Sequence, residues 1–585
     1  MDDQFNQNTA NNAGQPFNPY ANPQQGNPYV NRQQGNPNAG PQPQGEPHVN
    51  QAQQPQGNVP PNNPYAAPPI RQKPPRRRSV GRDVVMAVLM GISCFIMVDC
   101  YLWTGTLGMG FAIGAMVFLI AEVWYIAPFV KRKSVYSVLC IVLFAAGCVS
   151  LAFSADFFYK LLTLLGLMVL SACMVMDSMD LRTSEPDSFG SIGDYFYVVY
   201  AASFGKIGAG MYGLFHREAK DGTKKKAGFG KALLGLLIAL PFVALLAFLL
   251  YNGDEAFRGM LDNINLDKAP QKVLSIILAI PAFILLFSRL FSLRDLKRER
   301  RQESGKGLDS TVLFFFLLGV SIVYIAYLFS QLAYFFNGFM SFLPQDFTYA
   351  EYARRGFFEL TVVSMINIVI VILCTALCRK KEGKLPLGVK LASLFLCVFS
   401  LVLAFTEFAK MKMYMDNYGL TRLRVLTVLF MLFLAVVFLT LIVRLFIRKT
   451  PYMKVAVIFG AALVIALNFV NIDSVIAQYN VNAYETGKLE TIDVHTITRL
   501  NDAAVPYLLE LAEDKDTEVA QEAVDSLYYR WRSLHKNGKW DSSKWEYAPG
   551  ELIDYDYKGF NLTSHQARTL LLANEEMILS RRTTE

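Results

Sequence analysis

Residues 425–447 read VLTVLFMLFLAVVFLTLIVRLFI, and Arg444 is the single charged residue among them. A helix needs about 20 apolar residues to cross the hydrocarbon core of a bilayer, so this stretch predicts a transmembrane helix. Ten further segments have the same character, at residues 83–102, 105–126, 135–153, 157–176, 231–251, 271–292, 310–336, 357–378, 387–409 and 452–470. Their residues do not alternate between apolar and polar as those of barrel strands do. The chain is therefore expected to be an all-α polytopic membrane protein with about 11 transmembrane helices.

The composition agrees with a membrane protein. Hydrophobic residues make up 53% of the chain and charged residues 18%, whereas about a quarter of the residues in soluble domains are charged. No catalytic, nucleotide-binding or metal-binding motif is recognisable, and all eight cysteines lie in or beside apolar segments. We therefore expect no cofactor, no metal and no nucleic-acid partner. A non-enzymatic role is favoured over an enzymatic one.

Three regions follow one another along the chain. Residues 1–78 form a tail rich in Asn, Gln, Pro and Gly, which cannot bury enough apolar surface to become ordered; it is either a spacer or a docking strip for a protein partner. Residues 79–470 form the transmembrane domain. Residues 471–585 carry 12 basic and 20 acidic residues and are expected to fold as a small helical domain. In that domain, Thr563 and Gln566 have the spacing of a capping box at the start of the last helix.

The basic residues between the apolar segments alternate in density. The segments on one side of an 11-span arrangement carry 31 Lys and Arg residues, and those on the other side carry 10. Cytoplasmic loops carry the excess of positive charge. The pattern therefore predicts a cytoplasmic N-terminus and an extracytoplasmic C-terminal domain.

The longest loop on the basic side, residues 177–230, has a recognisable character of its own. Residues 193–215 look amphipathic, and Lys224, Lys225 and Lys226 follow them. Clustered lysines near a membrane attract anionic lipid. We expect this loop to lie on the inner leaflet, with the lipid bilayer, and anionic lipid in particular, as its partner.

Polar residues within the spans and charged residues at their outer ends are the candidate functional residues. In the span 310–336, polar side chains recur every three or four residues and therefore lie on one helical face; they line a polar cavity or make hydrogen bonds between helices. Several charged residues belong to the outer ends of other spans. Together the candidates are Asp254, Tyr324, Tyr327, Gln331, Glu351, Arg354, Arg355, Glu359, Glu407, Arg422 and Arg424. Glu122 is a further candidate for a buried ionisable group.

Three functions are compatible with these features. The favoured one is a transporter-like or scaffold body that carries an extracytoplasmic domain and an outer polar or charged site. The second is a membrane-embedded transferase acting on a lipid-linked or phosphate-bearing envelope substrate. Its base would be Asp254 or Glu351, and arginines would hold the phosphate. The third is an envelope sensor.

Several spaced stretches resemble one family of bacterial membrane proteins. They are YNGDEAF at 251–257, YARRGFFEL at 352–360, LTRLRVLTVLFMLFLAVVF at 420–438, IAQYNVNAYETGKLE at 476–490, LNDAAVPYLLEL at 500–511 and GFNLTSHQAR at 559–568. On these stretches the chain is similar to the multi-pass proteins grouped as domains of unknown function 4153 and 4173. The resemblance covers about residues 80–570. It implies a plasma-membrane protein of monoderm-type bacteria and brings no activity with it.

Overall fold

The structure of the protein is a computed structural model. It describes residues 78–184, 189–216, 269–294, 307–339, 357–380, 384–447, 450–536, 538–541, 546–553 and 556–582, together with scattered positions between 235 and 259. The predicted tail therefore lies outside the described residues, except for Arg78. Of the segment predicted to span the membrane at 231–251, only scattered positions are described.

Within the described part of the chain, nine helices are long and apolar enough to cross a membrane. A tenth apolar helix, α3, is shorter. These helices coincide with ten of the predicted spans and confirm the all-α polytopic class. Their bounds are α1 Gly81–Thr104, α2 Met109–Ile126, α3 Val135–Ser150, α4 Phe157–Ser178, α10 Ala269–Leu293, α11 Ser310–Phe339, α13 Phe357–Leu377, α14 Leu387–Tyr418, α15 Arg422–Phe446 and α16 Tyr452–Val470.

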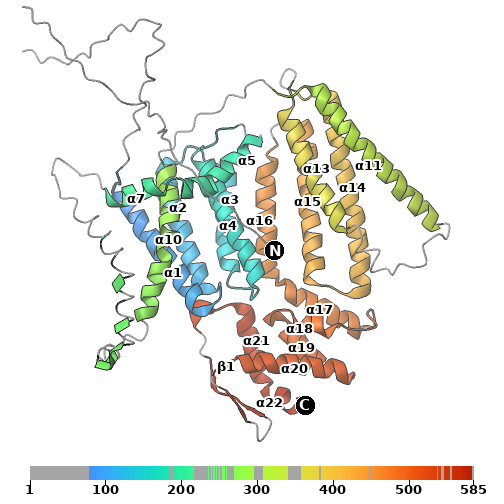
Figure 1. Cartoon of the computed structure of the whole chain (residues 1–585). Helices are drawn as coiled ribbons and strands as arrows, with labels where there is room; N and C mark the ends of the chain where they lie inside the picture. Colours follow the sequence, from blue (N-terminus) through green and yellow to red (C-terminus); the bar gives the residue numbers. More distant parts are fainter. Residues whose placement is uncertain are drawn as a thin grey trace, which may run out of the picture. The chain divides into compact units, whose positions relative to one another are not determined.

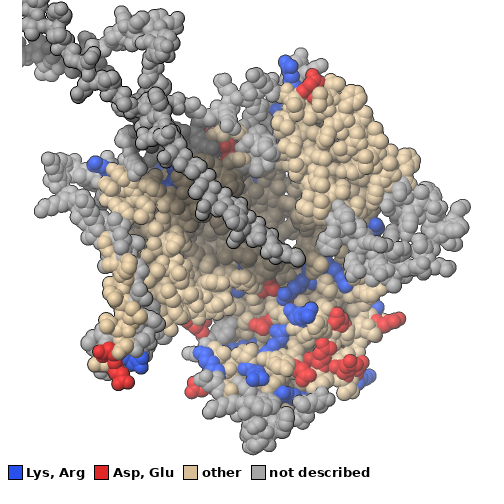
Figure 2. Space-filling view, in the orientation of Figure 1, with Lys and Arg blue, Asp and Glu red and all other residues tan. Residues whose placement is uncertain are grey.

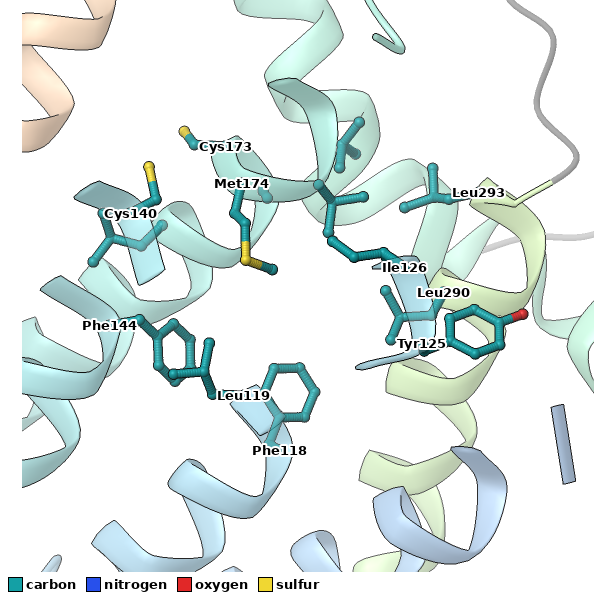
Figure 3. Close-up of a cluster of buried hydrophobic side chains, with 14 of the residues drawn as sticks. Phe118, Leu119, Tyr125, Ile126, Cys140, Phe144, Cys173, Met174, Leu290 and Leu293 are labelled. Atoms are coloured by element: carbon teal, nitrogen blue, oxygen red, sulfur yellow. The ribbon is translucent and has the colours of Figure 1, made fainter. Parts of the chain in front are cut away.

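The apolar helices pack in a chain of neighbours (Figure 1). Helix α10 packs on α1, α1 on α2, α2 on α3, and α3 on α4. Helix α16 contacts both α3 and α4, α15 packs on α16, and α14 packs on α15; α13 and α11 both pack on α14. One buried cluster contains side chains of α1, α2, α3, α4 and α10. Figure 3 shows Phe118, Phe144, Met174 and Leu290 within this cluster. A second buried cluster contains side chains of α11, α13, α14, α15 and α16. In Figure 2 the helices present a largely uncharged surface, which suits contact with lipid.

A smaller set of helices follows α16 within residues 471–585, and we refer to it as the C-terminal domain. It comprises α17 Ile472–Glu485, α18 Val494–Thr498, η3 Asp502–Ala504, α19 Val505–Leu511, α20 Thr517–Ser533, η4 Tyr557–Gly559, α21 Leu562–Ala573 and α22 Glu575–Arg581. Trp531 is fully buried within its apolar cluster. Two short antiparallel pairs that the sequence did not predict lie between α20 and η4: β1 His535–Lys536 with β4 Glu551–Leu552, and β2 Lys539–Asp541 with β3 Glu546–Ala548.

The predicted capping box at the start of the last helix is wrong. Asn561, not Thr563, caps α21, and its side-chain oxygen accepts the N–H of Ser564. The Thr563 hydroxyl instead donates to the carbonyl of Phe153, 2.7 Å away in the α3–α4 loop. The side chain therefore connects the C-terminal domain to the membrane helices rather than capping its own helix.

Loops that the charge pattern assigned to one side meet at one end of the helices. At the end where the C-terminal domain packs, which we call the docking end, the N–H of Met109 donates to Phe560 and the N–H of Leu562 to Ala152, both at 2.8 Å. At the opposite end, which we call the basic end, the N–H of Lys131 donates to Ser178 at 2.9 Å. The direction in which each end faces stays a prediction.

Candidate functional site

The C-terminal domain is joined to the membrane helices by a cluster of three charged residues, Asp156, Arg422 and Asp473, which we call the Arg422 cluster. Arg422 donates from Nε to Asp473 Oδ1 at 2.7 Å, and its Nη2 also contacts the second oxygen of that carboxylate. The same Nη2 lies 3.2 Å from Asp156 Oδ2. One guanidinium therefore connects α15, the start of α4 and the start of α17.

Local structure explains why both carboxylates lie where they do. Asp156 is the N-cap of α4 and accepts the N–H of Tyr159, and Asp473 lies in the first turn of α17. The N-terminus of a helix favours negative charge. Asp473 is fully buried and also accepts the N–H of Asn501 at 2.9 Å. Arg422 is therefore the counter-charge that makes burial of Asp473 tolerable.

A second contact beside this cluster depends on Asn480 of α17. Its amide accepts the N–H of Leu420 at 2.6 Å and donates to the Leu420 carbonyl at 2.9 Å. Gly419 makes the approach possible: it has φ +71, and a Cβ there would lie 2.5 Å from Asn480 Oδ1. The turn between α14 and α15 is thus held directly against the C-terminal domain.

Arg424 and Lys488 are also engaged at the docking end. Arg424 Nη1 donates to the carbonyls of Tyr418 and Gly419, and the guanidinium lies 4.0 Å from the centre of the Tyr414 ring. Hydrogen bonds with Tyr479 and Asp416 raise the pKa of Lys488. These contacts engage both side chains rather than leaving a free cationic pocket, and the Lys488–Asp416 pair is exposed.

A further ionic cluster, the Asp99 cluster, lies elsewhere at the docking end. Asp99 is 3% exposed, and its carboxylate is 2.6 Å from Lys272 of α10 and 3.2 Å from Lys558 of η4. It also accepts the hydroxyl of Ser275 at 3.0 Å, which in turn accepts the indole N–H of Trp103. The C-terminal domain is therefore attached to α1 and α10 as well as to α4 and α15.

The structure places the remaining predicted site residues apart from these clusters. Tyr324 donates to Asn367 Oδ1 at 2.7 Å, and Asn367 donates to Ser400 at 2.9 Å. The rings of Tyr324 and Tyr327 both contact Phe399. For Tyr324, these contacts correspond to the interhelical bonding alternative.

Other predicted residues take no part in the described contacts of the docking end. Glu407 is buried within α14, and Asp254 is exposed. Gln331 and Glu359 belong to α11 and α13, but their side chains lie outside the described residues, as do Glu351, Arg354 and Arg355 altogether. Whether these residues contribute to one outer site stays a prediction.

Glu122, which the sequence singled out as a buried ionisable residue, is fully buried. It accepts the hydroxyl of Ser171 at 2.8 Å and lies 3.6 Å from Arg289 of α10. Among the described residues, no group of three His, Cys, Asp or Glu is arranged to hold a metal ion.

Comparison with protein families shows to which family the chain belongs. The profile of the family described as domain of unknown function 4153 matches residues 84–511. The chain belongs to this family. The match includes Asp156, Arg422, Asp473 and Asn480, whereas Lys558 lies beyond its end. No curated protein and no solved structure matches the chain.

Sequence analysis of this DUF4153 protein did not identify three of the charged residues that form the ionic clusters at the docking end. They are Lys272, Asp473 and Lys558. Asn480 lies within IAQYNVNAYETGKLE, one of the stretches that carried the family resemblance. That stretch was a usable signal. The ionic partners of Lys272, Asp473 and Lys558 come from distant parts of the chain, and no local sequence pattern reveals them.

Proposed function

We propose that this integral membrane protein is a scaffold that holds its C-terminal domain in a fixed position on the extracytoplasmic face of the plasma membrane, as a platform for a protein partner. The Arg422 cluster carries the proposal. Its two buried carboxylates and their shared arginine connect the domain to two transmembrane helices at once. A domain that moved freely on a tether would not keep these ionic contacts.

The apolar core of the C-terminal domain supports the same function. Its buried cluster includes Tyr159 of α4 and Leu467 of α16, and Val425, Leu426 and Leu429 of α15 pack against it. The core of the domain therefore continues into the ends of three apolar helices. Movement of the domain as a separate body would expose that shared surface to water.

The contacts of Arg422 and Arg424 favour a scaffold over a phosphate-binding role for these two arginines. A phosphate-binding site needs guanidinium groups whose donors are available. Arg422 uses its donors on Asp473 and Asp156, and Arg424 uses Nη1 on two carbonyls. No specific observation favours a catalytic role for either.

In-cell photo-crosslinking tests the scaffold. A photo-reactive amino acid is placed at Tyr529 of α20, which is 65% exposed, and at Leu439 of α15, which is 52% exposed on an apolar helix. We expect a discrete protein adduct from position 529 that weakens in the Arg422→Gln variant at equal membrane abundance, and none from position 439. Absence of any discrete adduct at 529, and likewise at the exposed Tyr557, would contradict the scaffold function.

A further inference from the structure

The segment after α4 runs across the basic end of the helices (Figure 1). It consists of α5 Phe189–Phe196, the π-helical turn η2 Tyr197–Ala201, α6 Ala202–Phe204 and α7 Ile207–Phe215. Helices α6 and α7 pack on α10, and η2 packs on α4. The N–H of Ser79, just before α1, donates to the carbonyl of His216 at its far end. The segment therefore packs on the membrane helices and is attached at both ends.

One face of this segment is fixed to the core. Val198 is fully buried in the cluster that joins α1 to α4 with α10. Its carbonyl accepts Nε of Arg289 at 3.2 Å, and Nη1 of the same arginine donates to Ser171 at 2.9 Å. Arg289 in turn is the ionic partner of Glu122. The buried ion pair thus continues into the backbone of the segment.

The depth of that bond, counted from the helix ends, supports a position of the segment at the membrane boundary. Arg289 precedes the end of α10 at Leu293 by one helical turn, which is a rise of about 6 Å. Glu122 precedes the end of α2 at Ile126 by the same distance along its helix. Amphipathic helices in the plane of a membrane bury their apolar face about 5–10 Å into the headgroup boundary. Val198 therefore lies at the level that an interfacial helix occupies.

The opposite face is aromatic and exposed. Phe196, Tyr200 and Phe204 recur every four residues and are 62%, 43% and 59% exposed. The ring centroids of Phe196 and Tyr200 lie 5.0 Å apart, so these two side chains form an aromatic pair. Aromatic side chains of this kind are typical of the membrane–water interface.

Exposed positive charge accompanies the aromatic stripe. Lys206 lies two residues after Phe204 and is exposed, and Lys131, Arg132 and Lys133 are exposed at the same end. The N–H groups of Lys131 and Arg132 donate to the carbonyl of Ser178, the last residue of α4. Basic side chains at this level complement the headgroups of anionic lipids.

We propose that residues 189–215 form an interfacial lipid-binding element: Phe196, Tyr200 and Phe204 insert into the acyl boundary of the leaflet at the basic end, and Lys206 with Lys131, Arg132 and Lys133 binds anionic headgroups. The occupant is the bilayer surface itself, in the cytoplasmic leaflet by the positive-inside rule. This element is independent of the scaffold function at the docking end.

Spin labelling of the full chain in nanodiscs that contain phosphatidylglycerol tests the insertion. Single cysteines replace Phe196, Tyr200, Phe204 and Lys206 in turn; the native cysteines are all buried. Labels at 196, 200 and 204 should collide more with oxygen than with a water-soluble nickel complex, and the label at 206 should show the reverse. Equal exposure of all four labels to the nickel complex, or protection of 196, 200 and 204 from both reagents, would overturn the proposal.

Lipid retention tests the headgroup contact without touching the aromatic stripe. Lys131→Gln with Lys133→Gln is compared with Lys515→Gln and Lys536→Gln, a matched pair of exposed lysines in the C-terminal domain. In native mass spectrometry the first pair should retain severalfold less phosphatidylglycerol than the unaltered chain, and the second pair as much. Equal retention by both pairs would refute anionic headgroup binding at the basic end.

Discussion

Arg422, the first residue of α15, lies 3.2 Å from Asp156, the N-cap of α4, although long stretches of chain and several apolar helices separate them in the sequence. Asp473 completes the contact from the start of α17. The guanidinium thereby joins two transmembrane helices to the C-terminal domain. This relationship makes the domain part of the membrane body.

Arg422→Gln should destabilise the protein strongly. The fully buried Asp473 would lose its counter-charge, and removing one partner of a buried pair costs about 3–5 kcal/mol. We expect about 3 kcal/mol, the lower end of that range, because the Arg422 side chain is 37% exposed. Arg422→Lys should lose less. Thermal melting in detergent measures both, with Lys488→Gln as a control at an exposed pair whose loss should leave the Tm unchanged. An Arg422→Gln melting curve that matches the unaltered chain would show that the cluster does not stabilise the fold.

Gly419→Ala should lower the Tm more than Gly105→Ala. Both glycines have positive φ, at +71 and +65. An alanine at 105 meets no atom within 4 Å, so only the strain of the left-handed backbone applies, about 1–2 kcal/mol. An alanine at 419 would also approach Asn480 Oδ1 to 2.5 Å and disrupt its contact with Leu420. Equal losses in the two variants would mean that the α14–α15 turn does not pack closely on α17.

Tyr324→Phe should cost stability by loosening α11 from α13. The hydroxyl donates to Asn367, which is fully buried. Hydrogen bonds between transmembrane helices contribute about 0.6 kcal/mol on average and up to about 1.7. A double-mutant cycle with Asn367→Ala should give a coupling energy of this size. Purely additive effects would favour the alternative in which the tyrosine lines a polar cavity.

The charge pattern predicts that the docking end faces outward. A cysteine at exposed Tyr529 should react with an impermeant maleimide in intact cells, whereas a cysteine at exposed Lys131 should react only after the membrane is opened. Labelling of 131 but not of 529 in intact cells would reverse the assigned orientation and move the platform to the cytoplasm.

Much of the fold was predictable because the thickness of the bilayer sets the length of each apolar helix. The apolar stretch beginning at Val425 had to form a helix of spanning length, and α15 has it. The contacts of Asp473 and Lys558 were not predictable, since their partners are distant in sequence. Thr563 was assigned to a cap because threonine suits both caps and tertiary hydrogen bonds; the carbonyl of Phe153, which no local pattern reveals, is its acceptor. The strands between His535 and Leu552 are only two or three residues long and leave too little alternation to detect.

The measurement that tests the central claim most directly is the distance between spin labels in the membrane body and in the C-terminal domain. Cysteines at Leu439 of α15 and Tyr529 of α20 are both exposed, and pulsed electron resonance on the full chain in nanodiscs reports their separation. A domain held by the Arg422 and Asp99 clusters predicts one narrow distance distribution, which broadens when Arg422→Gln is combined with Asp99→Asn. A broad or multimodal distribution in the otherwise unaltered chain would contradict a fixed platform.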